Sequence, residues 1–387
     1  MPAQFDVLII GGGLVGASLA CALAGSGRRI GLVEAHPFDA GGTAQPSFDE
    51  RTTALAWGSR RLYEQWGLWA GLAAQAAPIR ALHVSQRGHL GVTRVHREDY
   101  GVEALGYVIP NRVLGRVLFE RVRGQDAVEL LAPMHFVGQA QGQDARAVTL
   151  RDAQCREQTL HARLVVGADG ANSQVRRALG IAASTRDYDQ SAVVTTVGCE
   201  RHHADTAYER FTPDGPIALL PRGQNACVAV WTGPSQDARR RCQQDEGAFL
   251  GDLQAAFGYR LGAMQRVGAR LAYPLSRLVC PRPLAARAVL VGNAGHTLHP
   301  AAAQGFNLAL RDVAVLARLL SVPGDPGAAD LIEAWFEARR PDQQRVSSFT
   351  DAIVRLFSNR VPGLGAARGL GLLGLELFPD IKHGMAR

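Results

Sequence analysis

The chain has 387 residues, of which 47% are apolar and 20% charged. This composition excludes an intrinsically disordered protein, and the length predicts two or three domain-sized units or one large interleaved pair. The net charge of +7 comes almost entirely from arginine, because Lys382 is the one lysine. A lysine Schiff base and a Walker-type phosphate lysine are therefore disfavoured. The chain has no basic run with interleaved aromatics, which argues against nucleic-acid binding.

Cysteine usage and the N-terminal segment both point to a cytoplasmic protein. The six cysteines form no Cys-x-x-Cys pair, which is typical of reduced thiols and disfavours a zinc site. Residues 7–25 are nearly free of charge and could be taken for a signal peptide. However, the preceding MPAQFD has no basic residue, and three consecutive glycines interrupt the apolar run. We therefore expect this segment to belong to the folded domain.

The first elements form a strand–helix–strand pattern with a glycine-rich turn. Phe5 to Ile10 is an apolar, β-rich run of the kind found in buried parallel strands. A Gly-x-Gly-x-x-Gly turn and a helical stretch to about Ser26 follow, and Ile30 to Val33 is the second strand. Glu34 comes 18 residues after the last glycine of the turn, close to the spacing of a dinucleotide-binding unit.

Each residue of this motif has a physical role toward a dinucleotide. Gly11 permits the tight turn, Gly13 lets a pyrophosphate approach the backbone, and Gly16 lets the helix pack on the strand. The helix N-terminus then faces the phosphates, and Glu34 accepts hydrogen bonds from ribose hydroxyls. The motif predicts a dinucleotide without deciding between NAD and FAD.

Two segments in the first third of the chain carry arginine or asparagine at a helix start. The stretch FDERTTAL precedes a helical region that ends near Trp69, and its Arg51 is either a surface arginine or a contact to the cofactor. A second helix is predicted from Asn111. Asn111 and Arg112 either cap and solvate that helix or reach the cofactor.

Two later strand–loop–helix segments are not needed by an NAD dehydrogenase. In the first, Leu164 to Ala168 reads as a buried strand, followed by a turn at Asp169-Gly170 and a short helix from Ser173 to Leu179. The second begins with a strand from Ala288 to Gly292 and continues into a helix from Gln304 to Leu320. A further loop at the carboxyl edge of a parallel sheet suits a long ligand spread across that edge.

Together these segments resemble the class A FAD-dependent aromatic hydroxylases. Within that class the stretches DERTTALAWGS, YERFTPDGPIALLP and LVGNAGHTLHPAAAQGFNLALRD are most similar to the ubiquinone-biosynthesis hydroxylases, closest to the 2-polyprenyl-6-methoxyphenol hydroxylases. The resemblance covers most of the chain. It implies an α/β fold in which a Rossmann-like FAD-binding domain is interleaved with an antiparallel β-sheet substrate domain and followed by C-terminal helices.

The resemblance also implies the domain order and the cofactor contacts. The expected segments are FAD-binding 1–79, substrate 80–99, FAD-binding 100–183, substrate 184–276, FAD-binding 277–350 and a C-terminal helical region 351–387. The residues expected to contact FAD are Gly11, Gly13, Gly16, Glu34, Arg51, Asn111, Arg112, Asp169, Gly170, Asn293, Pro300, Gln304, Gly305 and Asn307. In the substrate domain, Gly215, Pro216 and Leu219 either lie over the flavin ring or form a turn and a core leucine.

The stretch GNAGHTLHPAAAQGFN admits three functions. His296 and His299 could bind a metal or act as a base, but no further ligand at usable spacing supports a metal. We favour a backbone cradle, in which the following helix aims its N–H groups at the flavin ring and stabilises negative charge on it. We therefore predict no metal and no catalytic side chain, because the flavin carries the oxygen chemistry.

This stretch departs from the family pattern twice. Asn293 stands where aspartate is usual, and Ala303 stands where glycine is common. We expect the backbone at Ala303 to be compatible with alanine.

The implied reaction is hydroxylation of a polyprenylated phenol in ubiquinone biosynthesis through a flavin C4a-hydroperoxide. It uses O2 with NAD(P)H or another electron donor, alone or in a ubiquinone-biosynthesis complex. The apolar tail Ala352 to Pro379, interspersed with arginines, is either a helical cover or a contact to the inner face of the plasma membrane. Alternatives are another phenol hydroxylase or prenyl reductase on the same scaffold, and a flavin-binding partner without catalysis.

The glycine turn yields the first prediction. A side chain at Gly13 would push the pyrophosphate away from the backbone, so Gly13→Val should lose FAD while the fold persists. Flavin absorbance of the purified variant and its circular dichroism spectrum measure the two effects. A Gly13→Val protein that binds FAD as the wild type does would contradict the motif.

Overall fold

The computed structural model describes residues 3–37, 46, 49, 51–89, 91–299 and 303–358, and for 353–358 it describes the backbone alone. The chain divides into two units. Unit 1 comprises Met1–Gln75, Ile109–Arg186 and Arg277–Ser348, and unit 2 comprises Ala76–Val108, Asp187–Ser276 and Phe349–Arg387. The chain therefore passes from one unit to the other after residues 75, 108, 186, 276 and 348. From the sequence we expected domain changes after residues 79, 99, 183, 276 and 350.

Unit 1 is built on a parallel sheet with a short antiparallel extension. The order is β18-β19-β11-β1-β2-β8, and β9 and β10 continue from β11. Pairing is parallel from β19 to β8 and antiparallel at β18, β10 and β9. The strands are β1 (Phe5–Ile10), β2 (Ile30–Val33), β8 (Val128–Leu131), β9 (Met134–Gln141), β10 (Arg146–Asp152), β11 (Glu157–Gly167), β18 (Leu284–Ala285) and β19 (Ala288–Leu290).

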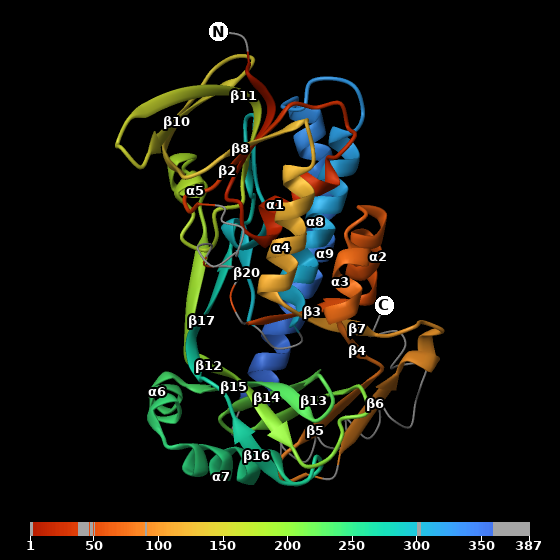
Figure 1. The fold of residues 1–387 in the computed structure, drawn as a ribbon. Coiled ribbons are helices and arrows are strands. Elements are labelled where there is room, and N and C mark those ends of the chain that lie inside the picture. The colour runs from red at the N-terminus through yellow and green to blue at the C-terminus, as the bar shows by residue number, and fades with distance from the viewer. Residues whose placement is uncertain are drawn as a thin grey trace. The chain divides into compact units, whose positions relative to one another are not determined.

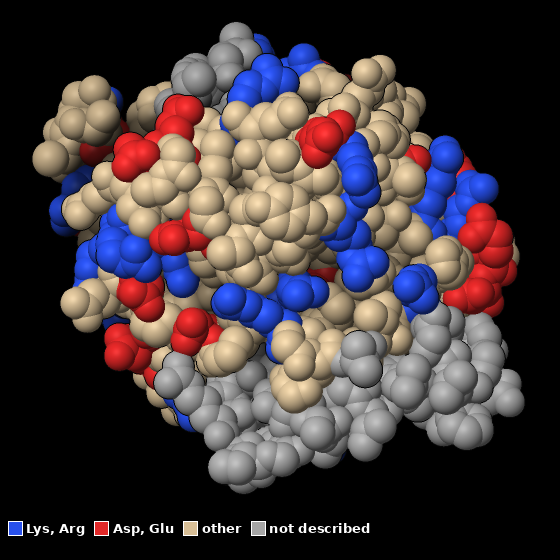
Figure 2. Space-filling view, turned by 90° about the horizontal axis from the view of Figure 1, so that it is seen from below, with Lys and Arg blue, Asp and Glu red and all other residues tan. Residues whose placement is uncertain are grey.

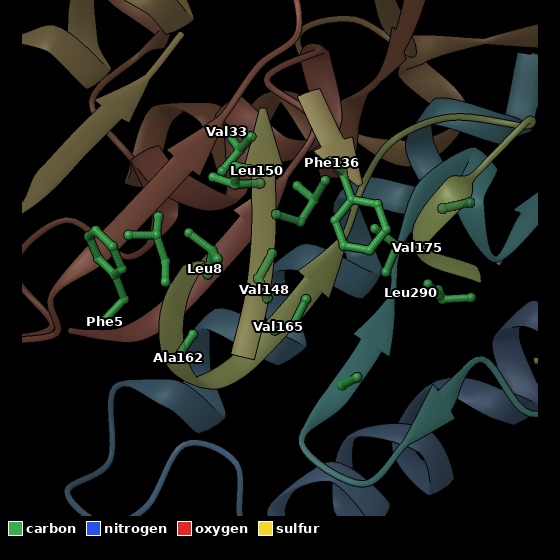
Figure 3. Close-up of a cluster of buried hydrophobic side chains, with 14 of the residues drawn as sticks. Phe5, Leu8, Val33, Phe136, Val148, Leu150, Ala162, Val165, Val175 and Leu290 are labelled. Carbon is green, nitrogen blue, oxygen red and sulfur yellow. The ribbon is translucent and has the colours of Figure 1, made fainter. Parts of the chain in front are cut away.

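Helices cover this sheet, and a buried hydrophobic core lies beneath the β9–β10 hairpin. Helix α1 packs against both α4 and α8 (Figure 1). The core beneath the hairpin joins Phe136 and Val148 to Leu8 and Val165 of the parallel strands, and Figure 3 shows these side chains interleaved. The helices are α1 (Leu14–Ala22), α2 (Trp57–Gln65), α3 (Trp69–Leu72), α4 (Asn111–Arg123), α5 (Gln174–Ala178), α8 (Gln304–Leu320) and α9 (Ala329–Ser358). The short elements β3 (Thr52–Ala56), β20 (His296–Thr297) and the 3-10 helices η1 (Ala73–Gln75) and η3 (Gly292–Ala294) complete the connections.

Unit 2 is built on a second sheet in the order β17-β12-β15-β14-β13-β5-β6, with β16 paired to β12. The pairing is antiparallel as expected, except that β13 and β5 run parallel. Helices α6 (Ser235–Gln243) and α7 (Glu246–Phe257) follow β15. The remaining elements are β4 (Ala77–Ile79), β5 (Ala81–Gln86), β6 (Val92–His96), η2 (Arg97–Tyr100), β7 (Gly106–Pro110), β12 (Ser184–Cys199), β13 (Thr206–Thr212), β14 (Gly215–Arg222), β15 (Ala226–Pro234), β16 (Met264–Val267) and β17 (Leu271–Val279).

Surface charge is mixed on the face shown in Figure 2. Arginine and acidic side chains are interspersed there with uncharged ones. The net charge of +7 is therefore not gathered into one basic patch on the described part of that face. Within the described residues, no helix combines the length and apolar character needed to span a membrane.

A buried ionic network joins α8 to α9 within unit 1. The Asp312 side chain is fully buried and accepts from Arg339 Nε at 2.6 Å and from Gln343 Nε2 at 3.0 Å. The indole N–H of Trp335 donates to the Asp312 carbonyl oxygen at 3.1 Å. Asp342 accepts from both Arg339 and Arg311, which lowers its carboxyl pKa to about 2 despite partial burial.

Removing one partner from this network should be costly. Arg339→Met would leave Asp312 charged and buried without its guanidinium, at a loss of about 3–5 kcal/mol in the free energy of unfolding. The neighbouring Arg340→Met is the matched control, because Arg340 is exposed and its pair with Glu337 spans 3.4 Å at the surface. Denaturant unfolding should separate the two variants, and equal losses would show that the buried pair is not what joins the helices.

Candidate active site

The carboxyl ends of four neighbouring strands meet at one edge of the unit 1 sheet. β2, β1, β11 and β19 lie side by side and parallel, so Glu34, Gly11, Ala168 and Val291 all emerge at this edge. The carboxyl edge of such a sheet is where open α/β folds bind ligands.

A cavity of about 760 Å³ opens at this edge. Of the residues expected to contact the cofactor, those that line it are Gly11, Gly13, Glu34, Arg51, Asn111, Asp169, Gly170, Asn293 and Gly305. Gly16, Arg112, Gln304 and Asn307 do not line it, and Pro300 lies outside the described residues. Sequence reasoning did not select several other lining residues, among them His36, Thr53, His135, Phe136, Asn172 and Thr297.

Two glycines of the turn leave no room for a side chain. Gly11 has φ +109°, and a Cβ there would lie 2.5 Å from the carbonyl oxygen of Ala168 on β11. A Cβ on Gly16 would overlap the carbonyl oxygen of Gly11 itself. Gly16 therefore acts from behind the cavity, because it lets α1 sit close to the end of β1.

The N-termini of two helices that have no side-chain cap lie at this cavity. Helix α1 starts after Gly13 with no side-chain cap and no acidic residue in its first turn. Helix α8 starts after Ala303, also without a side-chain cap or an early acid, and its Gly305 and Phe306 line the cavity. Such ends carry partial positive charge, which suits a pyrophosphate at one and electron-rich flavin oxygens at the other.

The acidic residues of the site are anchored by backbone groups. Glu34 is buried, and its carboxylate accepts from the N–H groups of Gly12 and His36, each at 2.9 Å. Asp169 accepts from Ser173 Oγ at 2.5 Å and from the N–H of Gln174 at 2.7 Å at the start of α5. Gly170 beside it has φ +80°, so the expected sharp turn is present.

Asn111 ties the segment that carries Arg51 to the start of α4. Its side chain accepts from Thr53 Oγ1 at 2.8 Å and donates to Asp49 Oδ1 at 3.3 Å. Asp49 in turn pairs with Arg51 Nε at 2.5 Å. Asn111 thus both lines the cavity and holds Arg51 in place, whereas the neighbouring Arg112 is exposed.

Asn307 acts as a clamp between α8 and β3. Its Nδ2 donates to the carbonyl oxygens of Ala54 and Ala303, each at 2.9 Å, and its Oδ1 accepts from the N–H of Ala56 at 2.8 Å. The amide group therefore orients the segment leading into α8 instead of facing the cavity.

The two histidines of the loop before α8 are buried. His296 Nε2 lies 3.5 Å from Asp312, and burial lowers the pKa of this imidazole, opposed by the Asp312 carboxylate. Burial lowers the pKa of His299 to about 4, so its ring is neutral near pH 7. Among the described residues, no group of three His, Cys, Asp or Glu side chains is placed to hold a metal ion.

Ala303 contradicts the expectation made for it. Its φ of 48° and ψ of 35° place it in the left-handed region, where an alanine side chain crowds the following carbonyl oxygen. The sequence resemblance placed glycine at this position, and the geometry explains why glycine suits it.

Of the two roles that the sequence left open for Leu219, the structure supports the core leucine, because its side chain is fully buried in the unit 2 core.

Comparisons with known proteins agree with this geometry. The family model described as FAD binding domain matches residues 4–350. The chain belongs to this FAD-binding family of flavoprotein hydroxylases. It is 39% identical to ubiquinone hydroxylase UbiL of Rhodospirillum rubrum, over 98% of this chain and 87% of that protein. It is 32% identical to 3-demethoxyubiquinol 3-hydroxylase of Escherichia coli, over 98% of this chain and 96% of that protein.

Solved structures support the same assignment. The crystal structure of PqsL, a probable FAD-dependent monooxygenase from Pseudomonas aeruginosa, matches 96% of this chain and 99% of its own, with a TM-score of 0.77 and 25% identity. The p-nitrophenol 4-monooxygenase PnpA from Pseudomonas putida shares the fold with a TM-score of 0.82, at 17% identity over 100% of this chain and 97% of its own. The predicted α/β fold, the FAD cofactor and the resemblance to ubiquinone-biosynthesis hydroxylases are confirmed. The protein is an FAD-dependent monooxygenase.

The left-handed residue before α8 yields a prediction. Ala303→Gly should raise the free energy of unfolding by about 1 kcal/mol and tighten FAD binding, because glycine relieves the strain before the helix. Titration of the apoprotein with FAD and thermal unfolding measure both effects.

Ala314→Gly is the control for this substitution, because Ala314 lies within the right-handed turns of α8. There glycine should lower stability by about 1 kcal/mol. If both glycine variants were destabilised, the strain assigned to Ala303 would be absent.

Proposed function

We propose that the protein hydroxylates the aromatic ring of a polyprenylated phenol in ubiquinone biosynthesis. The observation that carries the proposal is the cavity at which the strand ends of the unit 1 sheet and the N-termini of α1 and α8 converge. The relatives named as ubiquinone hydroxylases, which this chain covers almost end to end, support the substrate class.

The two units would divide the work. Unit 1 would hold FAD, with Gly11 and Gly13 against the pyrophosphate, Glu34 near a ribose and the N-terminus of α8 against the flavin ring. Bound FAD supplies the activation of O2. Unit 2 would bind the aromatic substrate. Neither His296 nor His299 is assigned a proton-transfer role, since burial lowers the pKa of both imidazoles and so makes them weaker bases.

Several partners follow as parts of the same proposal. NAD(P)H or another electron donor would reduce the flavin, and the enzyme would act alone or within a ubiquinone-biosynthesis complex. The tail 359–387 lies outside the described residues, so the proposed contact with the inner face of the plasma membrane rests on its composition. Leucines, glycines and scattered arginines there suit an anionic lipid surface.

A hydroxylation assay tests the proposal. The FAD-loaded protein, an electron donor and a short-chain prenylated phenol should consume oxygen, and the product should gain one oxygen atom that derives from 18O2. An equally fast reaction with unprenylated phenols would favour another phenol hydroxylase. FAD binding with reduction but no hydroxylated product from any phenol would favour a non-catalytic partner and refute the proposal.

A further inference from the structure

The two faces of the unit 2 sheet differ in how they are covered. On one face Leu219 and Trp231 pack with Phe249 and Phe257 of α7 into a closed hydrophobic core. Tyr208 of β13 packs on this core too, and its ring lies edge-on to Phe257 with centroids 5.8 Å apart. Because side chains alternate along a strand, the neighbour of Tyr208 on β13 projects to the other face.

That neighbour is Glu209, and it lies within an otherwise apolar row of cross-strand neighbours. Strand pairing places Glu209 opposite Val84 on β5 and Ala218 on β14. The row continues from Ala218 to Val230 on β15 and from Val230 to Val194 on β12. All five residues are half-buried, in contrast to the closed core on the other face. Glu209 is the one carboxylate in this five-strand row.

The carboxylate of Glu209 has no hydrogen-bond or ion-pair partner among the described residues. Burial raises its pKa from 4.5 to about 7, and no charged neighbour contributes to the shift. The nearest positions on the same face of β5 and β14 are Leu82, Gln86, Pro216 and Leu220, none of which titrates. Further along this face Arg222 donates to Thr196 Oγ1 at 2.9 Å. Strand β4 contacts β14, and β4 pairs with β7, which carries the titratable side chain of Tyr107.

An unpaired carboxylate among apolar side chains is unusual in a folded protein. Glutamate is almost never buried unless it is paired, because an unpaired carboxylate loses its hydration without compensation. A carboxyl group whose pKa is raised by desolvation is instead a candidate for a group that meets a ligand.

We propose that Glu209 accepts the proton of the phenolic hydroxyl group of the aromatic substrate. The apolar row formed by Val84, Ala218, Val230 and Val194 would receive the ring. This inference rests on the proposed function, since it requires a phenol as substrate. It adds a proton acceptor to a reaction for which the sequence predicted no catalytic side chain.

The proposed step is a proton transfer. The phenolic O–H bond breaks, the proton goes to a Glu209 carboxylate oxygen, and the electron pair stays on the phenolate oxygen. The pair raises electron density at the ring carbons, which are then better nucleophiles toward the activated oxygen. A free phenol has a pKa of about 10, so a carboxylate of ordinary pKa is a poor acceptor, and one whose pKa approaches working pH transfers the proton more readily.

Three variants separate the proton acceptor from a merely structural residue. Glu209→Gln keeps the shape and removes the base, and Glu209→Asp keeps the base but shortens it. The matched control is Asp252→Asn on α7, because Asp252 is an exposed carboxylate of the same unit. At pH 7.5 we expect kcat/KM for the prenylated phenol to fall about 100-fold in Glu209→Gln, by less in Glu209→Asp and not at all in Asp252→Asn.

The pH profile and substrate acidity are the readouts that a structural role would not move. In the wild type kcat/KM should rise with pH through about 7, and Glu209→Gln should lose this limb. A fluorinated phenol that ionises near pH 7 should need no base, so the defect of Glu209→Gln should shrink from about 100-fold to below about 10-fold. An unchanged pH limb, or an equal defect on both phenols, would overturn the assignment.

One measurement without turnover completes the test. Stability of the wild type should fall as pH rises from 4.5 to about 7, because the folded carboxyl binds its proton more tightly than the unfolded one. Glu209→Gln should lose that slope, and if it keeps the slope, Glu209 is not the buried acid.

The outcomes also separate this inference from the proposed function. If the wild type hydroxylates the phenol and Glu209→Gln does so equally well, Glu209 is not the acceptor and the proposed function stands. If the wild type hydroxylates no phenol, both fail together.

Discussion

The close approach of three backbone segments at Gly11 and Gly16 is the constraint on which the candidate site depends. Gly11 lies against the carbonyl oxygen of Ala168, and Gly16 lies against the carbonyl oxygen of Gly11. These contacts bring the end of β1, the end of β11 and the start of α1 together without an intervening side chain. The first turn of α1 can therefore point its N–H groups into the space where the strands end.

The segments around α8, β3 and α4 are positioned by side-chain hydrogen bonds. Asn307 holds the entry of α8 against β3, and Asn111 holds the segment carrying Arg51 against α4. Behind them Asp312 and Arg339 join α8 to α9. Buried amides and paired charges are costly when one partner is lost, so they specify one arrangement of these helices. A flat ring could then be met by the N-terminus of α8 in a fixed orientation.

Elements whose identity depends on local pattern were predictable from the sequence. The apolar run of β1, the glycine turn and the amphipathic run of α8 read directly as strand, turn and helix, and the structure gives Phe5–Ile10 and Gln304–Leu320 the predicted bounds. Glu34 and Asp169 were recognised because they follow strands. What they contact was not predictable, since the partners are backbone N–H groups and, for Asp169, the Ser173 hydroxyl, all brought into place by the turn geometry. The same limit applies to Asn307, whose partners on β3 lie about 250 positions earlier in the chain.

Ala303 and Glu209 show where pattern reading fails for physical reasons. The conformation of Ala303 is set by the junction between a loop and a helix. Alanine disfavours the left-handed backbone that this position adopts, so the residue type does not predict the conformation. Glu209 looks like an ordinary polar position in an alternating strand. That reading assumes that the face opposite a core is exposed to water.

The registers of β5, β13 and β14 show why that assumption does not hold for unit 2. They place Glu209 between Val84 and Ala218 on one face and Tyr208 opposite Leu219 on the other, so the strand carries apolar neighbours on both of its faces. Water is replaced on one face by α7, and on the other a carboxyl group is held among half-buried apolar side chains with its pKa raised by burial. A sheet of this kind can bind an apolar ring and still offer one proton acceptor. Neither His296 nor His299 in unit 1 offers a comparable acceptor, because burial lowers the pKa of both imidazoles.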